Sequence, residues 1–311
     1  MKVWRIGTRG SRLALWQAEQ VRRWMEAQGQ PAEIVIIKTS GDRLRGAPIA
    51  ATGLKGLFIK ELEEALLDGR VDLAVHSMKD VPTEIPGGLS FPALLRRDDP
   101  RDCLIGRTAP TLEQLPTGAR VGTSSIRRQA QLRHLRPDLQ VEMLRGNVDT
   151  RLARLDRGDF DAIVVARAGI ARLGLDHRIT QTFEPDLLLP AVAQGVIGVE
   201  TRAEDATLNG LLAGLDDADT RCAVEAERAL LGALHGGCQV PVGALARREG
   251  DRLWLIGAVA SPDGKTLVRL SEQGPTNAPR ALGEKLARRL LDAGADRLLA
   301  LARAPASSGS S

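Results

Sequence analysis

Apolar and polar positions alternate with two different periods along the first part of the chain. Short apolar runs predict buried strands at residues 3–7, 33–38 and 71–75. Apolar positions at helical spacing predict helices at residues 13–21 and 60–67. Because strands and helices follow one another in turn, the pattern predicts a mostly parallel sheet with helices on both of its faces.

The same arrangement then occurs a second time. Residues 5–12 are similar to residues 120–127, and residues 67–75 are similar to residues 155–164, in the same order along the chain. Two similarities in the same order predict two lobes built on one plan. Chance is the alternative explanation, since joints of strand, glycine and helix look alike in many proteins. Loops that face each other across paired lobes define a cleft, where a ligand is expected to bind.

The pattern changes in the last third of the chain. A helix is expected at residues 222–234, followed by three short strands near 241–247, 252–260 and 265–271. Tight turns join these strands, and an amphipathic helix covers about 277–293. These elements predict an α+β domain with a small antiparallel sheet.

The expected domain boundaries follow from these patterns. Residues 189–200 predict a return crossing between the lobes, and residues 216–219 form a polar linker. The terminal residues are rich in Ser, Ala and Gly, which is typical of a disordered tail. We expect lobe 1 at residues 1–97 with 196–216, lobe 2 at 98–195, a C-terminal domain at 217–303, and the tail at 304–311.

The composition is that of an ordinary globular protein and restricts the class of partner. Aromatic residues make up only 3% of the 311 residues, so stacking platforms for single-stranded nucleic acid are hard to build. The net charge of +4 is small, although arginines are dense between residues 120 and 154. The composition therefore indicates an anionic partner that is not a nucleic acid.

The N-terminus and the cysteines indicate a cytoplasmic location. No apolar run approaches the roughly 18 residues of a membrane helix, and the N-terminus enters a strand without an apolar signal core. Three cysteines without a CxxC spacing argue against a disulfide framework and against a zinc ribbon. We expect a monomer in the cytoplasm, without membrane contact and without a metal.

Four polar side chains follow the predicted strand at 71–75 within five positions: His76, Ser77, Lys79 and Asp80. Open α/β sheets place ligand chemistry at the carboxyl ends of their strands. The plain alternative is a capped strand end that carries a surface pair of lysine and aspartate. Alignment of the two lobes places a glycine, Gly169, where lobe 1 has Asp80, so only lobe 1 offers an acid there.

Arginines flank the turn that opens a helix in each lobe. Arg9 and Arg12 lie at the first turn, Arg127 and Arg128 lie at the second, and residues 145–151 form a third joint of this kind. Backbone N–H groups and the positive end of the helix dipole are expected to point into the cleft at such turns. Arginine binds carboxylates in a bidentate manner, which suits a ligand that carries several of them. For any single arginine, the plain alternative is a solvated surface charge.

A thiol lies in a glycine-rich loop just before the predicted antiparallel sheet. Cys238 follows two glycines, so its side chain is free to project; the plain alternative is a small residue in a tight loop. Half of a metal site with His235 lacks the further ligands that zinc requires. Cys103 and Cys222 lie in apolar or helical contexts and are expected to be inert packing residues.

Four motifs in this order resemble the porphobilinogen deaminase (hydroxymethylbilane synthase) family: residues 76–82, 122–128, 145–152 and 237–241. The similarity extends from about residue 3 to residue 300. Together with the internal repeat, it implies an α/β fold with two similar lobes of the periplasmic-binding-protein type that flank a cleft, plus the C-terminal α+β domain. It also implies a dipyrromethane cofactor covalently attached to Cys238.

The resemblance implies a role for each matching residue. Asp80 is the implied catalytic carboxylate. Cofactor contacts are implied for Cys238, Lys55, Ser77, Lys79, Asp80, Thr123, Ser125, Arg127, Arg128 and Gly146, and substrate contacts for Arg9, Ser11, Arg145, Arg151, Arg172, Gln194 and Gly195. One departure is Ala51, in a segment where many relatives carry a lysine, so we expect a weaker hold on one substrate carboxylate.

The implied reaction fits the residues. Four porphobilinogen molecules are joined head to tail on the primer with loss of ammonia, and hydrolysis then releases hydroxymethylbilane. Each unit adds an acetate and a propionate, which explains a cleft lined by arginines. Asp80 suits the stabilisation of the cation that remains when ammonia leaves, and the transfer of protons at that centre.

Two other classes of protein have some of these features. Two similar lobes with a polar cleft also describe solute-binding proteins, but these need no thiol on a third domain. An arginine-rich segment between residues 127 and 154 is compatible with RNA binding, but the low aromatic content and the modest net charge argue against it.

Overall fold

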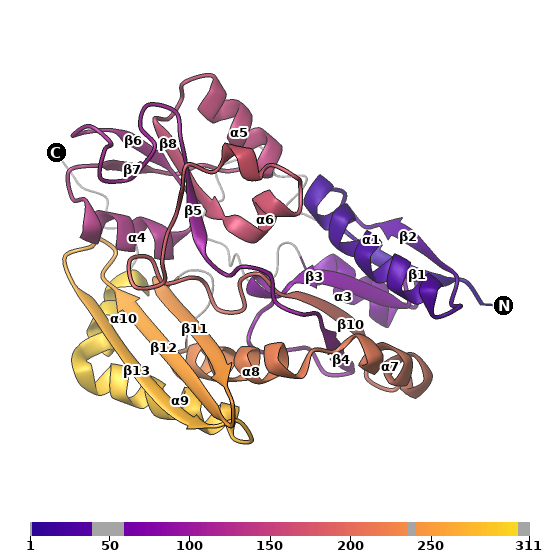
Figure 1. Cartoon of the computed structure of the whole chain (residues 1–311). Helices are drawn as coiled ribbons and strands as arrows, with labels where there is room; N and C mark the ends of the chain where they lie inside the picture. The colour runs from indigo at the N-terminus through magenta and orange to yellow at the C-terminus, as the bar shows by residue number, and fades with distance from the viewer. Residues whose placement is uncertain (1, 39–58, 236–239, 304–311) are drawn as a thin grey trace.

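The computed structural model describes residues 2–38, 59–235 and 240–303. Figure 1 shows three regions that surround the middle of the molecule: two α/β lobes and a C-terminal region with its own sheet. The predicted residues Lys55 and Cys238, and the predicted tail, lie outside the described ranges.

Lobe 1 is built on the first five-stranded sheet. Its order is β2 (Ala32–Ile36), β1 (Trp4–Thr8), β3 (Leu73–Ser77), β10 (Ile197–Arg202) and β4 (Leu89–Leu94). Helices α1 (Arg12–Ala27), α3 (Lys60–Leu67) and α7 (Ala206–Leu212) pack on it, and short 3₁₀ turns follow at η1 (Met78–Asp80) and η3 (Ala213–Leu215). Alternate residues of β3 face opposite sides: Leu73 and Val75 pack in the core under α1, while Ala74 packs under α3.

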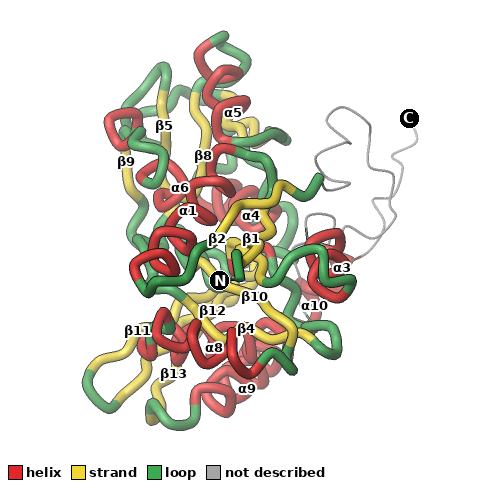
Figure 2. The backbone as a smooth tube through the Cα atoms, turned by 90° about the vertical axis from the view of Figure 1, so that its right-hand side faces the viewer, coloured by secondary structure: helices red, strands yellow, loops and turns green. Residues whose placement is uncertain are grey.

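Lobe 2 repeats this plan. Its sheet has the order β7 (Gln140–Glu142), β6 (Arg120–Gly122), β8 (Ala162–Ala166), β5 (Asp102–Gly106) and β9 (Gln181–Thr182). The helices are α4 (Ile126–Leu135), α5 (Val148–Asp156) and α6 (Arg167–Ala171), with a 3₁₀ turn at η2 (Asp176–Arg178). In both views, α1 of lobe 1 lies beside α6 of lobe 2 (Figures 1 and 2).

The two lobes correspond residue by residue where β1 of lobe 1 matches β6 of lobe 2. The backbone amide of Arg5 donates to Asp72 Oδ2 over 2.9 Å, and the amide of Arg120 donates to Asp161 Oδ2 over the same distance. The predicted α/β fold with two similar lobes is therefore confirmed.

The expectation of mostly parallel sheets needs a correction. In each sheet, two strand pairings are parallel and two are antiparallel. The antiparallel pairings all involve one strand, β10 in lobe 1 and β5 in lobe 2. Each of these strands follows a segment that crosses from the other lobe, and it therefore enters its sheet from the opposite end.

The C-terminal region contains the predicted antiparallel sheet. Its elements are α8 (Ala218–Ala233), β11 (Val242–Glu249), β12 (Arg252–Ala260), β13 (Leu267–Pro275), α9 (Pro279–Leu290), a π-helical turn (Leu291–Ala295) and α10 (Asp296–Arg303). Residues of α8, α9 and the sheet form one apolar core. None of the helices in the described ranges is long and apolar enough to span a membrane.

A buried carboxylate of α8 fixes both segments that cross between the lobes. Glu227 accepts two hydrogen bonds from the Arg97 guanidinium, at 2.7 and 2.8 Å. It also accepts from the backbone amides of Ala193 and Ala246, each over 2.7 Å. All these donors saturate a carboxylate that would otherwise be costly to bury, so the C-terminal region holds the crossing point in one geometry.

Candidate active site

The turn after β3 presents Asp80 to solvent. The amide of Met78 donates to Val196 O over 3.0 Å, and the amide of Val81 donates back to Met78 O over 3.2 Å. Met78 is buried against Gly198, where a Cβ atom would overlap its sulfur, so a larger residue at this position would displace the Met78 side chain. These contacts fix the 3₁₀ turn and leave the Asp80 side chain exposed at its end.

Five residues singled out from the sequence line one small cavity beside this turn: Arg9, Ser11, His76, Ser77 and Asp80. The cavity has a volume of about 90 Å³. Ser11 caps the N-terminus of α1 by accepting a hydrogen bond from the amide of Ala14, so the positive end of that helix lies at the cavity. The structure thus brings an acid, an arginine and a helix N-terminus together in lobe 1.

Gln17 also lines this cavity, and the sequence analysis missed it. Its side chain is 2% exposed, and its Nε2 donates to the hydroxyl of Ser77 over 2.8 Å. The signal in the sequence was a glutamine on a helix face that otherwise packs apolar residues such as Val21. A buried amide at such a position orients its neighbour, because it must be hydrogen-bonded.

The Asp80 charge acts on cations of both lobes. Burial lowers the pKa of Lys79 to about 8, and the Asp80 charge opposes this shift. Burial also lowers the pKa of Arg151 in lobe 2 to about 10, helped by Arg128 and again opposed by Asp80. Lys79 of lobe 1 and Arg151 of lobe 2 thus both lie within electrostatic range of Asp80.

The joint at residues 145–151 positions Arg151. Its Nε donates to Gly146 O over 2.8 Å, and its Nη2 donates to the hydroxyl of Ser124 over 3.0 Å. Gly146 has a φ of +110°, and a Cβ there would lie 2.7 Å from Thr150, so the turn requires glycine. Asn147 caps α5 by accepting from the amide of Thr150 over 2.9 Å. Arg145, in contrast, is exposed.

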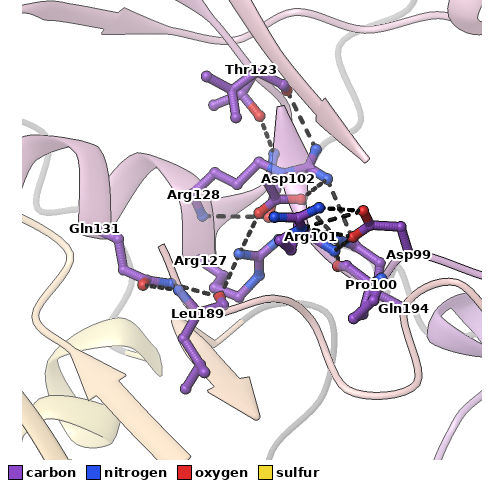
Figure 3. Close-up of polar contacts among 12 residues, drawn as sticks. Asp99, Pro100, Arg101, Asp102, Thr123, Arg127, Arg128, Gln131, Leu189 and Gln194 are labelled. Carbon is purple, nitrogen blue, oxygen red and sulfur yellow. Dashed lines mark hydrogen bonds and ion pairs between the residues drawn. The ribbon is translucent and has the colours of Figure 1, made fainter. Parts of the chain in front are cut away.

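Arg127 and Arg128 meet on one buried carboxylate, Asp102, at the start of β5 (Figure 3). Each arginine donates to a different oxygen of Asp102 over 2.7 Å, and Gln194 Nε2 donates to one of them over 2.7 Å. Burial would raise the pKa of Asp102, but the two arginines hold it well below its usual range. The sequence analysis missed Asp102 because an aspartate at the start of a strand carries no local signal.

Leu189 of the crossing segment joins this cluster. Its carbonyl accepts from Arg127 Nη1 over 2.6 Å, and its amide and carbonyl both bond to the side chain of Gln131 (Figure 3). Thr123 is buried in the turn before α4, and Ser125 caps this helix by accepting from the amide of Arg128. The predicted contacts of lobe 2 are thus anchored at the crossing segment.

Arg172 and Gly195 lie together at the same crossing. Arg172 donates to Asp98 Oδ2 over 2.8 Å and to Gly195 O over 2.7 Å. Gly195 has a φ of +88°, and a Cβ there would lie 2.6 Å from the carbonyl of Asp98. Arg172 also lines an open hollow of about 410 Å³ that includes Trp16 but not Asp80. The structure therefore does not bring this pair into the Asp80 cavity.

Family models and relatives match almost the whole chain. The model described as "Porphobilinogen deaminase, dipyromethane cofactor binding domain" matches residues 4–210, and "Porphobilinogen deaminase, C-terminal domain" matches residues 221–292. A porphobilinogen deaminase of Syntrophobacter fumaroxidans is 50% identical over 300 residues, which cover 96% of this chain and 97% of that protein. One of Methylobacillus flagellatus is 50% identical over 297 residues, covering 95% and 96%.

Two periplasmic proteins are among the solved structures that align with this chain. The aliphatic sulphonate binding protein of Escherichia coli is 18% identical with a TM-score of 0.41, covering 76% of this chain and 71% of that chain. The VFT2 domain of BvgS from Bordetella pertussis is 16% identical with a TM-score of 0.42, covering 68% and 85%. From the family models and the two relatives, the chain belongs to the porphobilinogen deaminase family.

Proposed function

We propose that the Asp80 cavity is the condensation site of this chain's porphobilinogen deaminase activity in tetrapyrrole biosynthesis, with Cys238 as the attachment point of the dipyrromethane primer. The activity itself follows from the family. The observation that carries the assignment is the position of Asp80 at a cavity of lobe 1 that Arg9 also lines, together with the action of the Asp80 charge on Lys79 and on Arg151 of lobe 2.

The charges around Asp80 fit a cofactor with several carboxylates. Lys79 and Arg151 both have lowered pKa values, because burial and neighbouring arginines disfavour their charged forms. A polyanionic group would relieve this repulsion, and Lys79, Arg151, Ser125 and Arg128 would hold its carboxylates. When bound, the group supplies the pyrrole α-carbon to which the next unit is joined.

Asp80 acts on the proton and on the charge of the substrate. Each condensation breaks the bond from the aminomethyl carbon to nitrogen and forms a bond from this carbon to the pyrrole α-carbon. The aminomethyl group, protonated on nitrogen, would depart as ammonia, and Asp80 would accept the proton that the α-carbon loses and then pass it to ammonia or solvent. While the substrate carbon is cationic, the Asp80 carboxylate stabilises it from a fixed position.

The substrate is held by other groups that line the same cavity. Arg9 and Ser11 lie at the N-terminus of α1, where the helix dipole favours a carboxylate. Gln17 holds the hydroxyl of Ser77, which lines the cavity together with Asp80. Porphobilinogen carries two carboxylates, so an arginine and a helix N-terminus at one wall suit its acetate and propionate.

The domain arrangement is also part of the proposal. We propose boundaries at residues 1–97 with 196–216, 98–195 and 217–303, which the three separate sheets support. In this arrangement, the thiol and the acid belong to different domains, and lobe 2 supplies most of the cations. A monomeric state and a cytoplasmic location stay predictions from the sequence.

The intact mass of the purified protein tests the attachment. We expect an excess that corresponds to two pyrrole units in the wild type and in Cys222→Ser, and no excess in Cys238→Ser. Cys222 is the matched control because it is a half-buried thiol that donates to the carbonyl of Thr276. An active protein with an unmodified thiol at position 238 would contradict the proposal.

A further inference from the structure

We infer that Glu200 is a positioning residue for Asp80, an inference that rests on the proposed function. Glu200 lies on β10, and its side chain is 0% exposed. Neither of its carboxylate oxygens receives a hydrogen bond from any group in the described ranges. Its close partner is His76 Nε2, 2.9 Å from Oε2, on a side chain that is itself 3% exposed.

Glu200 Oε2 and His76 Nε2 are close, but their approach is not aligned as a hydrogen bond. A buried carboxylate with so few donors is costly to keep in a fold, and its presence calls for a functional explanation.

Lobe 2 demonstrates that the fold itself does not need this pair. Asp72 corresponds to Asp161, so His76 corresponds to Val165 in the matching strand. Strand register then places Ile105 where lobe 1 has Glu200. Val165 and Ile105 are both buried in one apolar cluster. The same position in the same sheet is therefore filled by ordinary apolar packing where the following turn carries no acid.

Arg228 of α8 connects Glu200 to the chain just beyond Asp80. Its Nη1 donates to Val81 O over 3.1 Å, and its Nη2 donates to the carbonyls of Pro82 and Thr83. One guanidinium thus donates hydrogen bonds to three successive backbone carbonyls. Burial lowers the pKa of Arg228, and the charge of Glu200 opposes this shift, so the carboxylate stabilises the cation that holds the turn.

His76 connects Glu200 to the chain just before Asp80. It lies on β3 next to Ser77, and its ring packs edge-on against Phe91 with 5.9 Å between ring centroids. Glu63 of α3 faces the same group: burial raises its pKa, Glu200 raises it further, and His76 lowers it. His76 contacts Glu200 directly, while Glu63 and Arg228, both half-buried, lie within range of its charge. Through His76 and Arg228, it acts on both sides of the turn that carries Asp80.

The first test compares Glu200→Gln with Asp72→Asn. Asp72 is a matched control, because it is a buried carboxylate paired with Arg5 at the other end of β3. We expect Glu200→Gln to carry the cofactor by mass and to keep its KM, while its kcat falls about 10- to 100-fold, as for a slightly misplaced catalytic group. Asp72→Asn should keep its kcat at a comparable loss of Tm. Equal kcat in both variants would overturn the inference.

The second test exchanges the pair for its lobe 2 counterparts. The double variant His76→Val with Glu200→Ile should fold with a Tm equal to or above that of the wild type, because apolar residues replace a buried polar pair without cost. Its kcat should nevertheless fall as far as that of Glu200→Gln. A stable double variant with wild-type kcat would mean that the pair has only a structural role, which contradicts the inference.

Hydrogen exchange separates this inference from the proposed function. In Glu200→Gln, amides of residues 78–83 should exchange at least about tenfold faster than in the wild type, while Asp72→Asn leaves them unchanged. Unchanged exchange in Glu200→Gln would refute the positioning role whatever Asp80 does. Normal turnover of Asp80→Asn would instead refute the proposed function, and the exchange result alone would then decide whether Glu200 holds the turn.

Discussion

The two lobes share one plan but differ at the turn that follows β3 in lobe 1 and β8 in lobe 2. In lobe 1, Asp72 accepts a hydrogen bond from the backbone amide of Arg5 over 2.9 Å. In lobe 2, Asp161 accepts from the amide of Arg120 over the same distance. In lobe 1, the next strand end leads into a 3₁₀ turn that presents Asp80, whereas in lobe 2 it leads into α6, with Gly169 at the matching position. A repeated fold thus carries an acid at this position in one lobe only. The chemistry is a local addition to a shared frame.

The buried carboxylates next to these turns also differ between the lobes, in the number of hydrogen bonds that they receive. Asp102 in lobe 2 receives hydrogen bonds from two arginines and a glutamine, so its charge is saturated. Glu200 in lobe 1 has a single close partner among the described residues. Lobe 2 therefore uses its buried acid, Asp102, to hold cations. In lobe 1, the buried acid, Glu200, lies next to the turn that carries Asp80. Four predictions follow the comparison from the strongest effect to the weakest.

The strongest effect is expected on the saturated carboxylate of lobe 2. Asp102→Asn leaves Arg127 and Arg128 buried without their counter-charge, and it should destabilise the protein by about 3–5 kcal/mol. Urea unfolding measures this change. Glu142→Gln is the control, since it breaks an exposed pair with Arg120 in the same lobe and should have a much smaller effect. A loss below that of the control would mean that the cluster is not held by Asp102.

The next effect is on turnover in lobe 1. Asp80→Asn removes the acid of the cavity and should lower kcat about 10²- to 10³-fold, as the loss of one preorganised charge does. Because the side chain is exposed, its Tm should remain close to that of the wild type. Steady-state kinetics and thermal unfolding measure the two quantities. Asp68→Asn, an exposed change elsewhere in lobe 1, serves as the control, and near-normal turnover of Asp80→Asn would remove this carboxylate from the mechanism.

A smaller effect is expected from the titration of Lys79. In the folded protein its pKa is about 8, chiefly because of burial, whereas an unfolded lysine titrates near about 10.4. Between these pH values the unfolded chain binds a proton that the folded protein has released, so stability rises with pH across this window. In Cys238→Ser, which lacks the proposed attachment point, the rise should be on the order of 1–2 kcal/mol.

Lys79→Met is the control for that measurement, because it removes the titrating group from the same background. When Lys79→Met is combined with Cys238→Ser, the unfolding free energy should lack the rise between pH 8 and pH 10 that Cys238→Ser alone shows. In the cofactor-loaded protein, carboxylates near Lys79 should move the rise to higher pH. Identical pH profiles with and without Lys79 would exclude a lowered pKa.

The sequence predicted the features that are coded locally. Strand and helix periods placed the elements, and the similarity of residues 5–12 to 120–127 predicted the paired lobes. The antiparallel entry of β10 and β5 was missed, because it depends on where a crossing segment ends rather than on any local pattern. Within the site, exposed motif residues such as Asp80 were accessible from the sequence.

The buried polar residues were not accessible in the same way. Asp102, Gln17 and Glu200 each look like an ordinary strand or helix residue in the sequence. Asp102 acquires its role from arginines 25 and 26 positions away, and Gln17 from a serine 60 positions away. Such partners become visible only when the fold brings them together. The resemblance to a family names the residues that contact ligands and leaves out those that hold them.

The smallest effect is expected where the two lobes touch at the surface. Arg12 at the start of α1 donates to Asp149 at the start of α5 over 3.1 Å, and both side chains are about half exposed, at 57% and 47%. An exposed pair of this kind contributes less than about 1 kcal/mol and is screened by salt. Asp149→Asn should therefore lower the stability slightly at low ionic strength and leave it unchanged at high salt.

The Arg12 pair also tests how strongly the two lobes are coupled. The segments that cross between the lobes are held by buried, saturated contacts with the C-terminal region, such as Glu227 with Arg97, so these contacts and not the surface pair should fix how the two lobes sit. If so, kcat and KM of Asp149→Asn equal those of the wild type at every salt concentration. A variant with normal stability but an altered KM would mean that the surface pair sets the closure of the cleft, and the two lobes would then be coupled at their rim as well as at the crossing.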